Sequence, residues 1–182
     1  MIFPNTNTIQ FRNTSFCKIP KELMDISPFV TQLEFSHCVI PQNMSFISDL
    51  CQQVESLKLY GCQFNGALDL SPLGECKNLK ILCINGYDKG TLIQNIGCLQ
   101  WCPKLHTVYV CGCTIPTPLS GLGQCPCLNE LNLSGCKGVT GVGDLGDSIT
   151  LHTVVLIGTG VTDVSSLEKR CKSIEILDID IV

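Results

Sequence analysis

Fourteen cysteines and three histidines are the side chains of this chain that are best suited to metal binding or nucleophilic chemistry. Three pairs of cysteines are close enough in sequence to meet at one metal ion, namely Cys111/Cys113, Cys125/Cys127 and Cys98/Cys102. Structural zinc usually takes knuckles in which two to four residues separate the cysteines. The Cys-x-Cys spacing is therefore a weak signal, and we expect neither a metal nor another cofactor.

Catalysis by a thiol or hydroxyl needs a base within reach of the nucleophile. His37, His106 and His152 fall in three separate units of a repeating pattern, and the last two share one position of that pattern. The chain contains no Gly-x-Ser-x-Gly, phosphate-binding loop or His-Glu-x-x-His. The sequence therefore predicts a protein that is not an enzyme.

The spacing of the cysteines indicates a structural role for most of them. Nine occupy two positions of the repeat: Cys38, Cys62, Cys113 and Cys136 form one row, and Cys51, Cys76, Cys102, Cys125 and Cys171 form the other. A cysteine that recurs at one position acts as a small, buried apolar group. Stacked copies point their Cβ atoms in parallel, whereas a disulfide needs them to converge. We expect reduced cysteines and a cytoplasmic protein.

The repeat itself is a phrase of three apolar residues in the order apolar-x-x-apolar-x-apolar. It begins at Val30, Val54, Leu79, Leu105, Leu128, Leu151 and Ile174, so the steps are 24, 25, 26, 23, 23 and 23 residues. A fixed period of this size predicts a solenoid in which each unit packs on its neighbours. Residues 30–182 are interpreted as one continuous domain, and residues 1–29 as a degenerate repeat that caps it.

The phrase predicts a short strand followed by a turn. Alternating apolar residues place one side of the strand on the core and the other in solvent, and stacked copies form a parallel sheet. A glycine without a Cβ suits the turn, and five consecutive units have one at the same position: Gly61, Gly86, Gly112, Gly135 and Gly158. The next residue, usually cysteine, can donate weakly to a carbonyl. Spacings of three, as in Leu73-x-x-Cys76-x-x-Leu79, favour 3₁₀ turns on the return side.

On these residues the chain resembles the leucine-rich repeat family, with Cys, Tyr or Thr replacing the Asn of the family phrase. The stretch Leu131-Asn132-Leu133-Ser134-Gly135-Cys136 is similar to the short cysteine-containing repeats of trypanosomatid arrays and of the protein phosphatase-1 regulatory subunit. The resemblance implies an α/β fold: a curved horseshoe with a concave parallel sheet of about seven or eight short strands, and mostly 3₁₀ turns or short helices on the convex side. It also implies a protein partner on the concave face and no enzymatic activity.

Composition narrows the class of partner. The formal charge is −4, from 12 basic and 16 acidic residues, without a basic run. Nucleic acid and anionic membranes require clustered Lys or Arg, so we expect neither, and no apolar stretch is long enough to span a bilayer. The chain has a positive mean hydropathy with 15% charged residues, which indicates that a partner covers part of its surface.

We predict that outward residues of the strands bind this partner: Glu34, Lys58, Tyr60, Asn85, Tyr109, Cys111, Asn132, Val155 and Ile157. The last strand ends without a polar cover, so Ile179, Ile181 and Val182 are predicted to form an edge contact with a second copy or another subunit. Trp101 lies on the return side, as a structural residue or as an exposed anchor. The leading hypothesis is a scaffold or adaptor in a larger complex. The alternatives are a secreted or cell-surface recognition protein and a ubiquitin-ligase-type substrate receptor.

Overall fold

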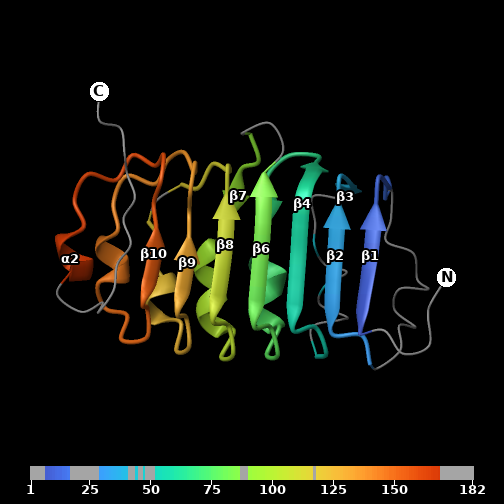
Figure 1. Cartoon of the computed structure of the whole chain (residues 1–182), viewed down its shortest axis with the longest axis horizontal. Helices are drawn as coiled ribbons and strands as arrows, with labels where there is room; N and C mark the ends of the chain where they lie inside the picture. The colour runs from blue at the N-terminus through green and yellow to red at the C-terminus, as the bar shows by residue number, and fades with distance from the viewer. Residues whose placement is uncertain are drawn as a thin grey trace.

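A computed structural model of the 182-residue chain describes residues 7–16, 29–40, 44, 47, 52–86, 90–116 and 118–168. The predicted repeat beginning at Ile174, with the proposed edge residues Ile179, Ile181 and Val182, lies outside the described residues. Within the described part, the chain advances from one end of a single parallel sheet to the other in sequence order (Figure 1).

Each strand of this sheet carries one copy of the apolar phrase. In spatial order the strands are β1 (Thr8–Arg12), β2 (Gln32–Ser36), β4 (Ser56–Phe64), β6 (Ile81–Gly86), β8 (Thr107–Cys111), β9 (Glu130–Asn132) and β10 (Thr153–Val155), and β3 (Val39–Ile40) pairs with the end of β4. Every pairing is parallel. The predicted parallel sheet is confirmed. β1 pairs in register with β2 and lies in residues 1–29, the part interpreted as a degenerate repeat that caps the domain.

The return segments lie behind the sheet and are short, as the spacing of three predicts. They form the 3₁₀ helices η2 (Ser71–Glu75), η3 (Ile96–Trp101), η4 (Leu122–Gln124) and η5 (Gly143–Leu145), the single turn of helix α2 (Ser165–Glu168), and a small second sheet of β5 (Leu68–Asp69) and β7 (Ile93–Gln94). We call this side the turn face and the outward side of the strands the sheet face (Figure 1).

One continuous core separates the two faces. The apolar residues of each phrase point into it, and Phe35, Leu57 and Leu131 are at most 1% exposed. At the N-terminal end, Phe11 stacks on Phe35 with ring centroids 5.0 Å apart, and Phe16 packs edge-on against both rings. These rings contribute large apolar surfaces to the core where the first two units meet.

The turns after the strands explain the recurring glycine. Gly61, Gly112, Gly135 and Gly158 adopt φ angles between +57° and +67°, the left-handed region that favours glycine. At Gly61 the register of β4 against β6 also shifts, as expected for a bulge. In the second unit His37 replaces glycine, with a φ of +52°. Its imidazole occupies the space that a side chain at position 61 would need, because an ideal Cβ there would lie 2.8 Å from the His37 Nδ1.

The first cysteine row follows these turns and binds one unit to the previous one. The thiols of Cys38, Cys62 and Cys136 donate to the carbonyls of Phe11, Phe35 and Val110, at 3.5, 3.3 and 2.9 Å. At the same position of a later unit, the Thr159 hydroxyl donates to the Leu156 carbonyl at 2.7 Å. The expected weak donor at this position is therefore present, buried below the sheet.

The second cysteine row departs from expectation at one residue. Cys102 and Cys125 are free and buried, and Cys102 donates to the Leu73 carbonyl at 3.1 Å. Cys76 instead is disulfide-bonded, so the prediction that every cysteine is reduced is wrong for Cys76. The expectation of parallel Cβ atoms assumes ideally stacked cysteines, and it does not hold at Cys76. Ten other described cysteines are free.

The turn face is held together by close backbone contacts at glycines. An ideal Cβ on Gly97 would lie 2.5 Å from the Ser120 carbonyl oxygen, and one on Gly121 would lie 2.5 Å from the Gly97 carbonyl oxygen. An ideal Cβ on Gly123 would overlap the carbonyl oxygen of Asp144 in the next unit. Glycine is therefore required wherever consecutive return segments touch through their backbones.

Candidate functional site

The sheet face brings the predicted partner-binding residues together in two adjacent rows. The strand register aligns Gln10, Glu34, Lys58, Cys83, Tyr109, Asn132 and Val155 in a central row. It aligns Arg12, Ser36, Tyr60, Asn85 and Cys111 in a second row at the carboxyl ends of the strands, where Ile157 follows β10. Eight of the nine predicted residues thus lie on one side of the sheet, and Ile157 is exposed just after the end of β10. Burial alternates along all of β2, and along β8 from Val108 onwards.

The first two strands carry a polar network that the sequence prediction includes only in part. Glu34 accepts hydrogen bonds from the Gln10 amide and the Ser36 hydroxyl, each at 3.4 Å. Arg12 donates to the Gln10 side-chain oxygen at 3.3 Å. The missed residues, Gln10 and Arg12, occupy the same phase of the degenerate first repeat as Glu34 and Ser36. Extending the outward pattern into residues 8–12 would have found them.

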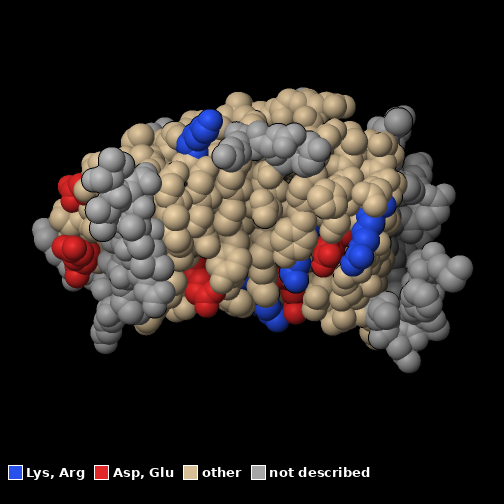
Figure 2. Space-filling view, turned by 45° about the horizontal axis from the view of Figure 1, so that its top comes forward, with Lys and Arg blue, Asp and Glu red and all other residues tan. Residues whose placement is uncertain are grey.

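Beyond Lys58 the face becomes largely uncharged. Cys83, Asn85, Cys111 and Asn132 occupy the next positions of the two rows, and Val155 and Ile157 follow, with Ile157 42% exposed. Figure 2 shows this face obliquely, with charged side chains as separated spots on a mostly tan surface. The sheet face therefore has an N-terminal part with several charged side chains and an increasingly apolar C-terminal part that carries Glu130 on β9.

Tyr109 is the most prominent aromatic side chain on this face, and it is 39% exposed. Its hydroxyl donates to a Glu130 carboxylate oxygen at 2.6 Å. This hydrogen bond, followed by burial and by the charge of Glu130, raises the pKa of Tyr109 to about 12. The bond fixes the ring across β8 and β9, which reduces the conformational entropy that a contact through this ring would cost.

Tyr60, the second predicted aromatic residue, is half-buried beside Cys83 and Glu34. Burial is the main cause that raises its pKa, followed by the charges of those two neighbours. Tyr60 therefore presents less open surface than Tyr109. The two rings also belong to different rows of the face.

Asn132, which is predicted to bind the partner, also forms hydrogen bonds within the chain. Its Oδ1 accepts hydrogen bonds from the Ser134 backbone N–H at 2.9 Å and the Ser134 hydroxyl at 2.6 Å. The Cys111 thiol donates to the same oxygen at 3.5 Å. This arrangement turns the chain after Asn132, so β9 contains three residues where the corresponding β8 contains five.

Three outward positions are buried, contrary to the simple alternation. Ser56, Cys83 and Thr107 are 5%, 8% and 8% exposed. Small side chains are easily covered by larger neighbours along a row, and Ser56 lies between Gln32 and Ile81. The Ser56 hydroxyl is buried without a hydrogen-bond partner, so this point on the sheet face retains an unsatisfied polar atom.

The thiols of the sheet face are poorly suited to act as nucleophiles. Burial is the main cause that raises the pKa of Cys83 and of Cys111 above the usual thiol value. A nucleophilic cysteine needs the opposite shift, because the thiolate is the reactive form. Two of the three histidines make hydrogen bonds to groups other than these thiols: His106 pairs with Thr107, and His152 contacts Asn129 and the Thr150 carbonyl.

The Cys-x-Cys pairs do not converge on a common metal position. Gly112 turns the backbone between Cys111 and Cys113, so Cys111 faces outward and Cys113 is fully buried. Cys127 is exposed, whereas Cys125 is 2% exposed. Among the described residues, no group of three His, Cys, Asp or Glu side chains is arranged to hold a metal ion.

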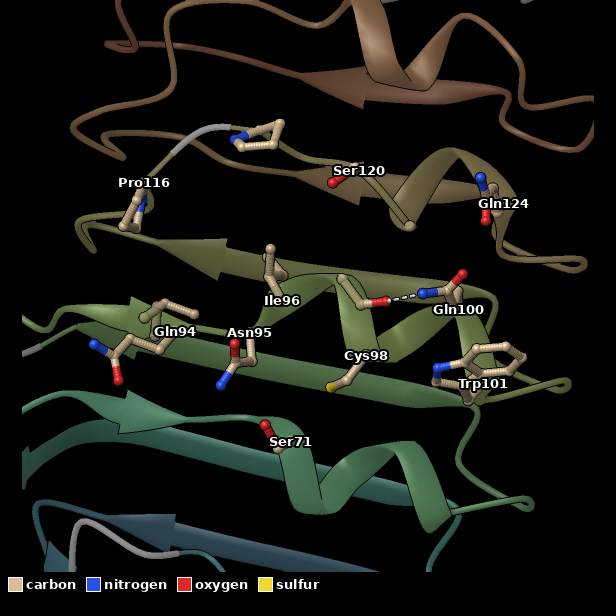
Figure 3. A pocket seen from close by; sticks show the side chains of 14 residues that line it. Ser71, Gln94, Asn95, Ile96, Cys98, Gln100, Trp101, Pro116, Ser120 and Gln124 are labelled. Carbon is tan, nitrogen blue, oxygen red and sulfur yellow. Dashed lines mark hydrogen bonds between the residues drawn. The ribbon is translucent and has the colours of Figure 1, made fainter.

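On the turn face, Trp101 is 62% exposed at the end of η3. This exposure agrees with the interpretation as an exposed anchor, and a role in binding stays a prediction. The indole borders a groove with a volume of about 910 Å³ that crosses η3 and the segments on either side of it (Figure 3).

Comparison with solved structures supports the architecture. Internalin C2 from Listeria monocytogenes superimposes with a TM-score of 0.64 at 19% identity, and the match covers 82% of this chain and 73% of that one. A second internalin of the same organism, inlF, matches with a TM-score of 0.50 at 17% identity, over 81% of this chain and 49% of that one. No family model matches the sequence, and no curated protein matches it either.

These matches and the parallel register define a leucine-rich repeat solenoid, so the predicted fold class is correct. At this level of identity the likeness concerns the fold alone. The trypanosomatid-type or phosphatase-subunit-type assignment of the repeats stays a prediction. No helix in the described part of the chain has the length and apolar character needed to cross a bilayer.

Proposed function

We propose that the chain is a non-enzymatic protein-interaction module that binds a protein partner across the sheet face. The observation that carries the proposal is the continuous outward surface of seven parallel strands, on which Tyr109 is exposed and held in place by Glu130. A fixed aromatic ring with a polar tip is typical of interface hot spots. The leucine-rich repeat fold suits this role, because its sheet offers an extended surface.

The surface divides the proposed contact into two parts. Glu34 and Lys58 lie in the charged N-terminal part, where they favour a partner with complementary charges. Tyr109, Val155 and Ile157 supply aromatic and apolar area in the C-terminal part. Seven strands spaced about 4.8 Å apart span roughly 29 Å, which is adequate for the approximately 800 Å² per partner of a standard interface.

Site-specific photo-crosslinking tests this assignment. A benzophenone amino acid at position 109 should crosslink the partner, whereas the same group at Thr140, exposed in the loop before η5, should not. Against the crosslinked partner, Tyr109→Ala should weaken binding by about 2 kcal/mol, or roughly thirtyfold. Tyr109→Phe, which keeps the ring, should lose less. Wild-type affinity in Tyr109→Ala would move the binding site away from the centre of the sheet face.

The cellular setting is part of the proposal. The preferred setting is an intracellular scaffold in a larger complex, which is supported by the ten free cysteines among the described residues. The second candidate is a secreted or cell-surface recognition protein, and the disulfide at Cys76 favours it because such bonds persist mainly in oxidising compartments. Differential alkylation of Cys76 before and after reduction, in protein purified from its source, separates the two. A reduced Cys76 supports the intracellular setting.

A further inference from the structure

We infer that the groove on the turn face is a second binding site, and that it takes a neutral oligosaccharide. The groove lies beside η3 on the turn face (Figure 3), whereas Tyr109 belongs to β8 and the sheet face, so a ligand there would occupy a surface separate from the proposed protein interface. Its volume of about 910 Å³ falls within the range of small-molecule sites.

The lining of the groove is polar but uncharged. None of its fourteen lining residues is Asp, Glu, Lys, Arg or His. Instead, exposed amide and hydroxyl side chains surround it: Gln94, Asn95, Gln124, Ser71 and Ser120. A charged ligand would find no opposite charge in this lining. A ligand with many neutral donors and acceptors matches it.

Most of these polar groups are available to a ligand. Among the described residues, none donates to or accepts from the side chains of Gln94, Gln124 or Ser120, whereas the Ser71 side chain is hydrogen-bonded to Asp69. Asn95 is oriented differently, because its Nδ2 donates to an Asp69 carboxylate oxygen at 2.8 Å. That bond, with a second one from the Ser71 N–H, lowers the pKa of Asp69. It also leaves the Asn95 side-chain oxygen as an acceptor.

The floor of the groove is narrow because backbone contacts replace side chains. Gly97 and Gly121 bring η3 and the segment before η4 into direct contact, and neither position accommodates a Cβ. The polar side chains on both sides therefore stand above a glycine-lined floor. Six residues of 3₁₀ helix rise about 12 Å, so η3 extends alongside a short chain of linked sugar rings.

Trp101 provides the feature that distinguishes a sugar from other neutral ligands. It lies at the end of η3 opposite Asn95, and one edge of its indole approaches Gly74, where an ideal Cβ would be 3.7 Å from Cδ1. With 62% of the residue exposed, the indole is available for stacking. The apolar face of a sugar ring stacks on such an aromatic surface, while its hydroxyls bond to amides. A proline-rich peptide usually docks in a groove lined by several aromatic residues, and this lining contains one.

The experiment uses the whole chain and the fluorescence of Trp101, which is its only tryptophan. Cellohexaose, chitohexaose, maltohexaose and mannohexaose are each titrated to about 10 mM, tenfold above a Kd of about 1 mM. At least one should give a saturable change in emission. Decaproline is titrated in parallel as the competing peptide ligand.

Calorimetry on variants then locates the site. Gln94→Ala and Gln124→Ala should each weaken binding of the responding sugar by about fivefold or more, and Trp101→Ala should abolish it. Ile149→Ala, at a residue that is 87% exposed and outside the groove, and Tyr109→Ala should bind as wild type does. Circular dichroism shows whether each variant is folded.

Any of four results would overturn the inference. One is the absence of a saturable response to all four sugars, and another is a response that persists unchanged in both glutamine variants. The third is saturable binding of decaproline without binding of any sugar, which would assign the groove to peptides. Loss of sugar binding in Tyr109→Ala alone would place the sugar on the sheet face, and this would also contradict the inference.

Discussion

The two faces of the solenoid are built on different principles. On the sheet face, outward side chains such as Lys58, Tyr109 and Val155 stand above the strands, and the sheet remains intact beneath them. On the turn face, backbone touches backbone at Gly97, Gly121 and Gly123. Substitutions on the first face change what the surface offers to a partner. Substitutions at the glycines of the second face alter the distance between units.

The largest loss of stability should therefore come from a substitution on the turn face. Gly123→Ala places a Cβ on the Asp144 carbonyl oxygen, which belongs to the backbone and cannot rotate away. We expect a loss of about 3 kcal/mol in the free energy of unfolding, at the upper end of overpacking effects. Urea denaturation followed by circular dichroism measures it.

Gly141→Ala is the matched control, because an ideal Cβ there meets no heavy atom within 4 Å. It should leave the free energy of unfolding unchanged or raise it by about 0.4–1 kcal/mol, because alanine lowers the conformational entropy of the unfolded chain. Equal stability of the two alanine variants would show that backbone contacts at glycine do not define the turn face.

An intermediate effect is expected at a sheet-face residue that also shapes the chain. Asn132→Ala removes the two hydrogen bonds from Ser134, each worth about 1 kcal/mol, so the free energy of unfolding should fall by about 1–2 kcal/mol. Asn85→Ala, at an exposed position in the adjacent row, should change it by less than about 0.5 kcal/mol. If Asn132→Ala costs more than Gly123→Ala, the contrast between the faces is wrong.

The smallest effect concerns the Tyr109–Glu130 pair and appears at high pH. The pKa of Tyr109 is about 12 in the folded protein, compared with 10.0 for a free tyrosine, so the folded state holds this proton more tightly. The stability that the folded protein gains from holding this proton is complete below pH 10 and is lost as the pH rises from 10 to 12.

Spectroscopic titration of the phenolate follows this group directly. In Glu130→Ala the hydrogen bond and the charge that raise the pKa are absent, so the Tyr109 midpoint should move down towards 10. Tyr109→Phe identifies its transition, since the chain has three tyrosines. A midpoint that does not move in Glu130→Ala would mean that this bond does not hold the ring.

Sequence periodicity predicts most of the fold because each unit repeats the same local geometry. The phrase around Leu57 and Leu59 determines the side of β4 that is buried, and the parallel stacking then aligns Glu34 with Lys58. The spacing Leu73-x-x-Cys76 likewise predicts η2. These features depend on interactions within a unit or between equivalent positions of neighbours.

Features that depend on non-equivalent positions could not be predicted in the same way. The Tyr109–Glu130 bond is diagonal across two strands and depends on the rotamers of both side chains. The turn-face groove gathers Ser71, Gln94 and Gln124 from three units, and no spacing in the sequence relates them. The disulfide at Cys76 breaks the equivalence of its row, so periodicity argues against it.

The unbroken parallel order from β1 to β10 affects how such a protein can change over evolutionary time. Duplication or loss of one unit of 23 to 26 residues would lengthen or shorten the sheet by one strand spacing, about 4.8 Å. The units on either side would keep their own contacts, apart from those at the new junction. The chain can therefore gain or lose reach in discrete steps, while the chemistry of each step is decided separately by its few outward residues.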